Sequence, residues 1–212
     1  MELANNGDFA AVLDHPTFSQ DVKLVRTYLH QLVQGLEYLH SNGVYHLDIK
    51  PENLLLNKDF HLKIADFDSC YIKGDKKIIS RGTGNFRAPE LICKEPIDPE
   101  VADIYSVGIF LFSMRCGLLP YSEEELINGV DLFELAMNDF EEFWKMHQEL
   151  NDNASIFIDK EFKDLFRSMI RFDTKKRMRL ADVKKHKWYQ GPTYTSTELK
   201  AKMNKILKKK TF

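Results

Sequence analysis

The stretch "HLDIKPENLLLNKDFHLKIADFD", residues 46–68, decides the fold assignment of this chain. It sets Asp48, Asn53 and Asp66 at fixed spacings in an otherwise apolar frame, with Lys50 between the first two. The short β-prone runs "LLL" and "HLKI" around "NKDF" predict a small hairpin. Asp48 and Asn53 then lie in the loop before this hairpin and Asp66 in the loop after it, so we expect these side chains to meet.

The segments on both sides of this stretch predict helices. Residues 18–44 repeat apolar side chains every three or four positions. Ser19 is a candidate N-cap and Asn42-Gly43 a candidate end. Residues 98–121 are apolar nearly all round, as expected of a helix at the centre of a domain. Further amphipathic segments are at residues 123–126, 132–150, 160–172 and 180–185. The predicted fold class is mainly α, a helical bundle around a buried central helix with a small β-hairpin that carries the polar loops.

The composition is that of an ordinary globular domain. Its 212 residues are 43% hydrophobic and 29% charged, enough to bury one substantial core. The net charge of -2 gives no indication of a nucleic-acid partner, and no apolar run is long enough to span a bilayer. The three cysteines, Cys70, Cys93 and Cys116, are odd in number and form no C-x-x-C pair. We therefore expect a reducing compartment, cytoplasmic or nuclear, with the cytoplasm as the default.

The polar residues of the opening stretch suit phosphoryl transfer. Amide and carboxylate oxygens bind Mg²⁺, which in such sites is also held by substrate phosphates, so Asn53 and Asp66 are the predicted metal ligands. Asp48 could accept a hydroxyl proton, and Lys50 could neutralise phosphate charge that grows during transfer. The pattern therefore predicts a site for a divalent cation and a nucleotide's terminal phosphate.

With two more motifs, the chain resembles the C-terminal lobe of a eukaryotic protein kinase. The family patterns H-R-D-x-x-x-x-N, D-F-G and A-P-E appear in order as His46-Leu47-Asp48 with Asn53, Asp66-Phe67-Asp68 and Ala88-Pro89-Glu90. Lys50 is the residue that serine/threonine kinases carry at its position. The resemblance therefore implies a serine/threonine protein kinase that uses ATP and Mg²⁺ to phosphorylate a protein substrate. The run "SVGIFLFSMRCGLLPY" is most similar to the calcium/calmodulin-dependent group.

The resemblance also implies the domain limits. It covers residues 1–189, with the hinge at 1–8, the catalytic loop at 46–53 and the activation segment at 66–90. By the same resemblance the hinge backbone at Glu2 and Leu3 binds adenine, Asp8 reaches the ribose and Leu55 forms an apolar floor under the adenine. The sequence begins at the hinge, without the family's glycine-rich loop or V-A-I-K lysine. The expectation is a C-terminal lobe without its N-terminal lobe, binding ATP poorly by itself.

Other matched residues have supporting roles in the family. Asp103, in "ADIYSVGI", is implied to hold the backbone of the catalytic loop. Arg177 is implied to pair with Glu90, and Thr83 to contact Asp48. His46 is implied to be structural, with no chemical role.

Two positions depart from the family pattern. Leu47 stands where regulated kinases have the arginine that receives an activation-loop phosphate, which argues against activation by loop phosphorylation. Asp68 stands in place of the glycine of D-F-G, and its side chain restricts the backbone there. These departures keep a second class open, a pseudokinase or non-catalytic protein-interaction scaffold. The retained Asp48, Lys50 and Asn53, together with Asp66, favour the enzyme.

The tail, residues 190–212, differs in charge from the rest of the chain. From residue 196 onward it has six lysines against one acid, Glu198, for a charge near +5. Its apolar residues share one helical stripe: Leu199, Met203, Ile206 and Leu207. The pattern favours a helix lying on the lobe, and the alternatives are a membrane-surface helix, a calmodulin-target helix or an autoinhibitory segment.

Overall fold

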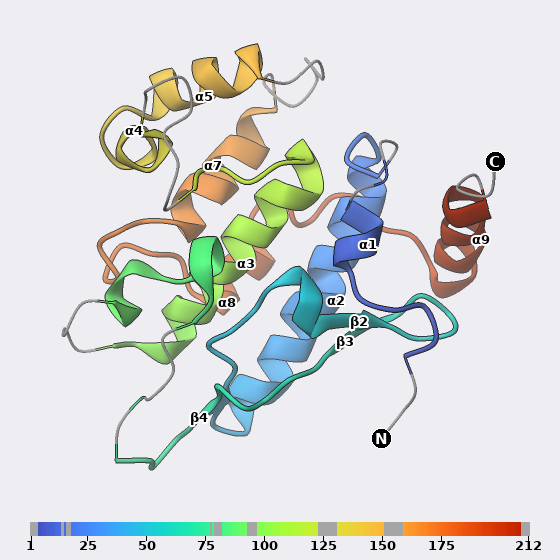
Figure 1. Cartoon of the computed structure of the whole chain (residues 1–212), viewed down its shortest axis with the longest axis horizontal. Helices are drawn as coiled ribbons and strands as arrows, with labels where there is room; N and C mark the ends of the chain where they lie inside the picture. The colour runs from blue at the N-terminus through green and yellow to red at the C-terminus, as the bar shows by residue number, and fades with distance from the viewer. Residues whose placement is uncertain are drawn as a thin grey trace.

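A computed structural model describes residues 4–13, 15, 18–76, 78, 82–92, 97–122, 131–150 and 159–208 of the chain. Helices dominate this part, and its strands pair in two small antiparallel sheets (Figure 1). The helices are α1 (Ala10–Leu13), α2 (Val22–Ser41), α3 (Pro99–Cys116), α4 (Leu132–Asn138), α5 (Phe140–Glu149), α7 (Lys160–Met169), α8 (Leu180–Lys185) and α9 (Ser196–Lys208). The strands are β1 (Val44–Tyr45), β2 (Leu54–Leu56), β3 (Leu62–Ile64) and β4 (Tyr71–Ile72). Short 3₁₀ turns lie at Pro51–Asn53, Gly84–Phe86 and Pro89–Leu91.

Helix α2 leads into residues 46–53, the predicted catalytic loop. Its apolar face, including Leu29 and Leu32, is fully buried. The helix ends at Asn42 with Gly43 at a φ of 72°, as predicted. The prediction of Ser19 as the N-cap was wrong: the Asp21 carboxylate accepts a hydrogen bond from the amide of Leu24, at 2.9 Å. Asp21 is the N-cap because its side chain reaches the amide three residues further along the chain.

Helix α3 is the buried central helix that the sequence predicted. Every residue from 101 to 116 is buried, including the charged Asp103. Gly108 lets α7 approach closely, because a Cβ at this position would lie 3.0 Å from side-chain atoms of Met169 and Ile170. Within the described ranges, no helix is both long and apolar enough to cross a membrane. Because α3 is buried over residues 101–116, it forms the internal frame against which the loops pack.

The predicted hairpin is present as β2 and β3, with Leu54 opposite Ile64 and Leu56 opposite Leu62. Its tip is closed by Asn57, whose side-chain oxygen accepts two backbone amide hydrogen bonds. The backbone of residues 6–9 pairs with the outer edge of β2. The second sheet, β1 with β4, was not predicted, because strands of two residues are too short to show an alternating pattern.

The helices after α3 are shorter than predicted. The expected helix over residues 132–150 is two helices, because Asp139 ends α4 and its carboxylate caps α5 through the amide of Glu142, at 3.1 Å. Helix α7 ends at Met169 rather than at 172, and α8 has the predicted limits. The segment expected at 123–126 lies outside the described residues.

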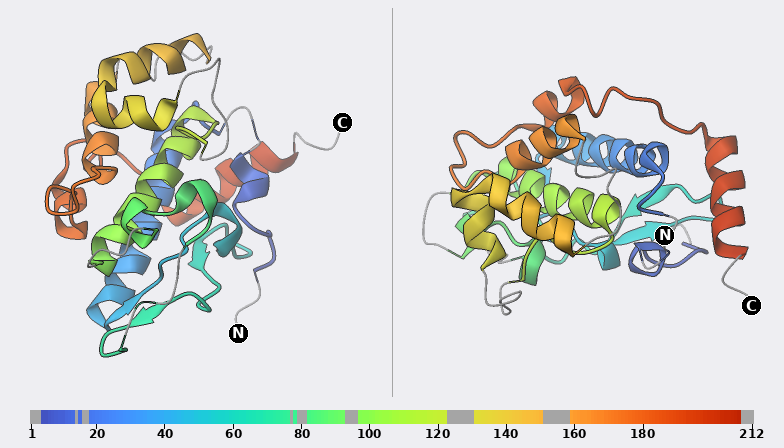
Figure 2. Two further views of the ribbon diagram at one scale, coloured as in Figure 1. Left: turned by 60° about the vertical axis from the view of Figure 1, so that its left-hand side comes forward. Right: turned by 90° about the horizontal axis from the view of Figure 1, so that it is seen from above.

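Helix α9 packs against the rest of the described domain, the arrangement that the sequence analysis favoured. It stands beside the tip of the β2–β3 hairpin and the start of α2, at the opposite side of the molecule from α4 and α5 (Figures 1 and 2). Its apolar residues Leu199, Met203 and Ile206 are buried in the common core. The tail helix is thus part of the folded domain.

Candidate active site

The catalytic loop is fixed to the central helix by a single carboxylate. Asp103, fully buried on α3, accepts hydrogen bonds from the backbone amides of His46, at 3.0 Å, and Leu47, at 2.7 Å. Leu47 has a φ of 60°, a left-handed conformation that costs a branched residue about 1–3 kcal/mol. Because two charge-assisted hydrogen bonds hold this strained turn, the loop has one defined conformation. This is the contact that the family resemblance implied for Asp103.

His40 is a second partner of Asp103 that sequence reasoning missed. Its Nε2 atom lies 2.8 Å from Oδ2 of Asp103. The residue sits in the last turn of α2, one residue before the helix ends. A histidine in the final turn of a helix that leads directly into the catalytic loop is the signal that could have pointed to it.

Asp48, Lys50 and Asn53 meet, as the spacing predicted. Oδ2 of Asp48 is 3.0 Å from Nζ of Lys50 and accepts a hydrogen bond from Nδ2 of Asn53, at 3.1 Å. The same Asn53 nitrogen also donates to the backbone carbonyl of Asp48, at 2.9 Å. Oδ1 of Asp48 is buried and has no hydrogen-bond partner within the described ranges. A buried acceptor without a donor is costly, and a substrate hydroxyl would supply that donor.

Lys50 also joins the catalytic loop to the activation segment. Its Nζ atom donates a hydrogen bond to Oγ1 of Thr83, at 2.9 Å. The expected contact between Thr83 and Asp48 is therefore indirect and runs through the lysine. A single ammonium group therefore bridges the Asp48 carboxylate and the Thr83 hydroxyl.

Asp66 lies on a neighbouring loop that the backbone ties to the first. The amide of Ala65 donates to the carbonyl of Asn53, at 2.9 Å, and Nε2 of His46 donates to the carbonyl of Ala65, also at 2.9 Å. Nδ1 of His46 accepts from the amide of Asp48, at 3.3 Å, so one neutral tautomer satisfies both contacts. The structural role implied for His46 fits this geometry.

The Asp66 carboxylate is exposed and is set by a second left-handed residue. Asp66 has a φ of 62°, and its Oδ1 accepts a long hydrogen bond from the amide of Asp68, at 3.4 Å. Within the described ranges it makes no hydrogen bond to Asp48 or Asn53. Among the described residues three non-glycine positions have a positive φ: Leu47, Asp66 and Phe60, which lies between β2 and β3. Leu47 and Asp66 flank the polar cluster, where strained backbone often has a functional reason.

The donor set fits a weakly held Mg²⁺. Asn53 uses its amide nitrogen on Asp48, which leaves its amide oxygen for a cation, and Asp66 offers a carboxylate on the adjoining loop. Among the described residues no three histidine, cysteine or acidic side chains are grouped as a metal cage. Two oxygen ligands without a cage are what Mg²⁺ takes when nucleotide phosphates complete its shell.

The residues implied for nucleotide binding are placed in part. Asp8 bridges Leu55 across the edge of β2, so these two lie side by side. Leu55 is half-buried between the fully buried Leu54 and Leu56, so its side chain faces the opposite way from the core. Oδ1 of Asp8 accepts a hydrogen bond from the amide of Ala11, at 3.3 Å. The other implied hinge residues, Glu2 and Leu3, lie outside the described residues.

The end of the activation segment is anchored by a buried ion pair. Arg177 donates to Glu90 through both guanidinium nitrogens, at 2.5 and 2.9 Å, and also to the carbonyl of Val101 on α3. Both side chains are buried, so this bidentate pair fixes the segment to the central helix. The implied pairing is present.

The sequence also matches a known protein family. The model of the protein kinase domain matches residues 1–189. This chain belongs to the protein kinase family. The mainly helical architecture, with small sheets that carry the polar loops, agrees with a kinase domain.

Curated members of the family are similar over most of the chain. CBL-interacting protein kinase 26 of Oryza sativa subsp. japonica is 31% identical over 195 residues, 90% of this chain and 36% of that protein. SNF1-related protein kinase catalytic subunit alpha KIN12 of Arabidopsis thaliana is 30% identical over 201 residues, 92% of this chain and 37% of that protein. Serine/threonine-protein kinase GIN4 of Saccharomyces cerevisiae is 31% identical over 188 residues, 88% and 16% respectively. The chain spans little more than a third of the length of the plant relatives.

Proposed function

We propose that this kinase-family chain takes part in transfer of the γ-phosphoryl group of ATP to a serine or threonine hydroxyl of a protein. The observation that carries the proposal is the state of Asp48, which has one oxygen held by Lys50 and Asn53 and the other buried without a partner. The names of the similar proteins, which are protein kinases, support the same class of reaction.

Each group has a defined part in this proposal. Oδ1 of Asp48 accepts the proton of the attacking hydroxyl, while the contacts to Oδ2 keep the carboxylate oriented. Lys50 sits between Asp48 and Thr83 and neutralises charge on the transferred phosphate. Asn53 and Asp66 would hold Mg²⁺, which supplies charge neutralisation on the nucleotide phosphates.

The finer assignment places the described fold in the C-terminal lobe. In this proposal residues 1–189 form that lobe, residues 190–212 form its tail, and the calcium/calmodulin-dependent group is the most similar subgroup. Asp8 and Leu55 then lie on the adenosine side of the nucleotide. The family's glycine-rich loop and V-A-I-K lysine are not among the 212 residues, so nucleotide affinity measured on this chain is expected to be weak.

The proposed base is tested by phosphate transfer. Asp48→Asn removes the proton acceptor and keeps the shape, so transfer from radiolabelled ATP to a serine-containing protein should fall about 10²–10⁴-fold. Asp182→Asn, the same change on exposed α8, is the matched control and should leave transfer unchanged. Equal transfer by the wild type and Asp48→Asn would contradict the assignment.

A scaffold function is the second candidate, and two observations favour it. Leu47 is buried in the core, so the position where regulated kinases bind an activation-loop phosphate offers no cation. Asp68 adds a second exposed carboxylate beside Asp66. Calorimetry with Mg²⁺-ATP separates the candidates: the enzyme predicts a heat of binding that Asp66→Ala abolishes. Identical heats for both proteins would remove the metal site and support the scaffold.

A further inference from the structure

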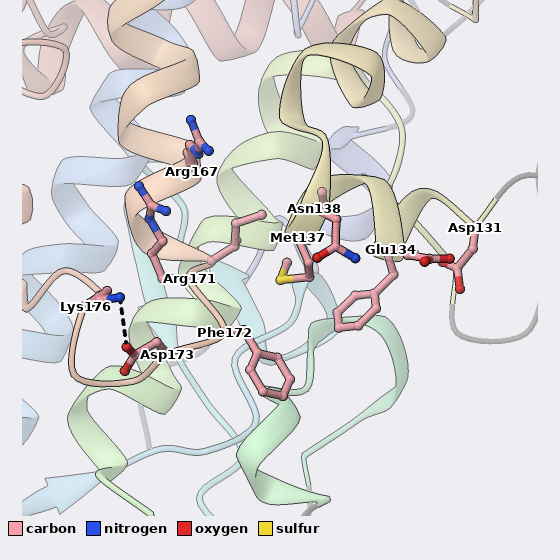
Figure 3. A pocket seen from close by; sticks show the side chains of 12 residues that line it. Asp131, Glu134, Met137, Asn138, Arg167, Arg171, Phe172, Asp173 and Lys176 are labelled. Carbon is pink, nitrogen blue, oxygen red and sulfur yellow. Dashed lines mark hydrogen bonds and ion pairs between the residues drawn. The ribbon is translucent and has the colours of Figure 1, made fainter.

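A cavity of about 530 Å³ lies between α4 and the loop that follows α7, and none of the proposed catalytic residues lines it (Figure 3). Its volume is in the range of binding pockets. The apolar part of the lining, its floor, includes Met137 on α4 and Ile170 and Phe172 after α7. Phe172 is 57% exposed, although large apolar side chains are usually covered. The cavity therefore offers an apolar contact surface to a ligand.

On the α7 side of the cavity lie two guanidinium groups. Arg167 and Arg171 lie one helical turn apart and are neighbours on one wall in Figure 3. Arg167 rests on the ring of Phe140, with its guanidinium carbon 4.9 Å from the ring centre. Within the described ranges, neither arginine forms an ion pair with a carboxylate. Two adjacent cations that form no ion pair within the described ranges attract anionic groups.

Two of the acidic residues in the lining are already engaged. Asp173 pairs with Lys176, at 3.5 Å, and accepts a hydrogen bond from the amide of Lys175, at 3.0 Å. Asp131 caps α4 by accepting from the amide of Glu134, at 3.0 Å. The Glu134 side chain lies across the cavity from the arginines in Figure 3. The cavity thus has a cationic wall, an apolar floor and an acidic far rim.

The cationic wall is held in place by the structure beneath it. The carbonyl of Arg171 accepts a hydrogen bond from Nε of Arg177, at 2.8 Å, and Arg177 is the buried partner of Glu90. The amide of Met178 donates to the carbonyl of Ser168, at 3.0 Å. Because the backbone of this loop is fixed, binding there need not pay for ordering it.

We propose that this cavity docks an acidic segment of a protein partner. Its carboxylates pair with Arg167 and Arg171, and a neighbouring apolar side chain enters between Met137 and Phe172. The acidic rim at Glu134 opposes a polyanion such as nucleic acid and favours a peptide whose charge is confined to one end. This inference stands apart from the proposed catalysis, because it uses none of the same side chains.

An adjoining cavity gives the docked segment a direction. This second cavity, of about 340 Å³, shares Asp131 and Phe133 with the first and is also lined by Arg87 and Ile92 of the activation segment region. A peptide anchored at Arg171 can therefore continue along the surface toward the activation segment. The docking site and the proposed transfer site then lie on one path for a bound protein.

The proposal is tested by selecting a random-peptide display library on the purified chain. Enriched peptides should carry glutamate or aspartate next to leucine, phenylalanine or another large apolar residue. For a synthesised winner, Arg167→Ala and Arg171→Ala should each weaken binding about tenfold in fluorescence anisotropy. Lys205→Glu, on exposed α9 and away from the cavity, is the control and should bind as the wild type does.

A charge swap completes the test. Arg171→Glu should reject the selected peptide and bind a version whose acidic residues are replaced by lysine. Thermal unfolding of each variant reports whether the exposed substitution has left the fold intact. No acidic and apolar consensus among the enriched peptides, or equal binding by the wild type and Arg171→Glu, would overturn the proposal whether or not the chain transfers phosphate.

Discussion

The catalytic loop and the C-terminal helix are both held by carboxylates, but in opposite settings. Asp103 is fully buried and anchors the loop through backbone amides and His40. Helix α9 is tied by Lys202 to Asp21 and by Lys200 to Asp59, pairs that are open to solvent in part. Buried charges are costly to unpair, whereas exposed pairs contribute about 0–1 kcal/mol each. The comparison teaches that the loop depends on its polar anchor, while the tail depends on its apolar stripe.

The strongest way to break this comparison is to remove the buried anchor. Asp103→Ala leaves the amides of His46 and Leu47 without an acceptor, so the free energy of unfolding should fall by about 3–5 kcal/mol. Urea unfolding followed by circular dichroism measures the loss. Asp98→Ala, at the partly exposed start of the same helix, is the control and should cost about 1 kcal/mol. Similar losses for the two variants would show that the buried carboxylate is not special.

The next effect concerns the apolar stripe of the tail. Met203 is fully buried, so Met203→Ala should destabilise the chain by about 2–4 kcal/mol and open α9 to trypsin at its lysines. Lys205→Ala, exposed on the same helix, should change neither the unfolding midpoint nor the cleavage rate. If Met203→Ala changed neither the stability nor the cleavage, α9 would not unfold together with the rest of the domain.

The next effect concerns His147, a buried histidine, and tests how burial of a polar side chain makes stability depend on pH. Burial lowers the pKa of His147 to about 4, against the opposing hydrogen bond to the carbonyl of Pro120, at 2.8 Å. The unfolded chain binds this proton near pH 6.5, so stability is complete above that pH and falls by about 2–3 kcal/mol as the pH drops toward 4. Between pH 6.5 and 4, the free energy of unfolding should change less with pH in His147→Phe than in the wild type. A difference between the variants that does not change with pH would refute the assignment.

The smallest effect is expected at the partly exposed ion pair between Lys202 of the tail and Asp21. Burial raises the pKa of Asp21, but hydrogen bonds from Lys202, from the Leu24 amide and from Tyr194 outweigh it and leave the pKa below its usual value. The contribution is therefore present above pH 4 and is lost as the pH falls through the lower folded pKa. Lys202→Met should remove about 1 kcal/mol or less at neutral pH, and added salt should shrink the difference. A larger, salt-independent loss would count against an exposed tie.

The sequence predicted the parts of the site that depend on spacing. Asp48, Lys50 and Asn53 meet because the turn at Pro51–Asn53 brings positions five apart together. The buried helix α3 was evident because its apolar residues extend all round it. The left-handed backbone at Leu47 was not predictable, because leucine rarely adopts it, whereas aspartate, as at Asp66, is among the residue types that adopt it more often. At Leu47 it depends on anchors distant in sequence.

Contacts between distant segments were the other limit. The position of His40 in the last turn before the loop is a local signal, but no local pattern identifies Asp103 as its partner. Nor does one indicate that Thr83 reaches Asp48 through Lys50. The cap at Asp21 and the break at Asp139 depend on which of several polar side chains reaches a free amide. Such competitions are decided by tertiary packing, which periodicity does not encode.

The internal use of the tail's apolar stripe sets a condition on any ligand that recognises this helix. Leu199, Met203 and Ile206 face the core, so a calmodulin-type protein that grasps them must first detach α9 from the hairpin tip. The free energy of that detachment reduces the net free energy of binding, and each 1.4 kcal/mol lowers the apparent affinity about tenfold. A protein cannot bind these residues while α9 is packed on the domain. Binding of the tail would therefore also break the contact of Lys200 with Asp59, which lies at the end of the strands that lead to Asn53 and Asp66.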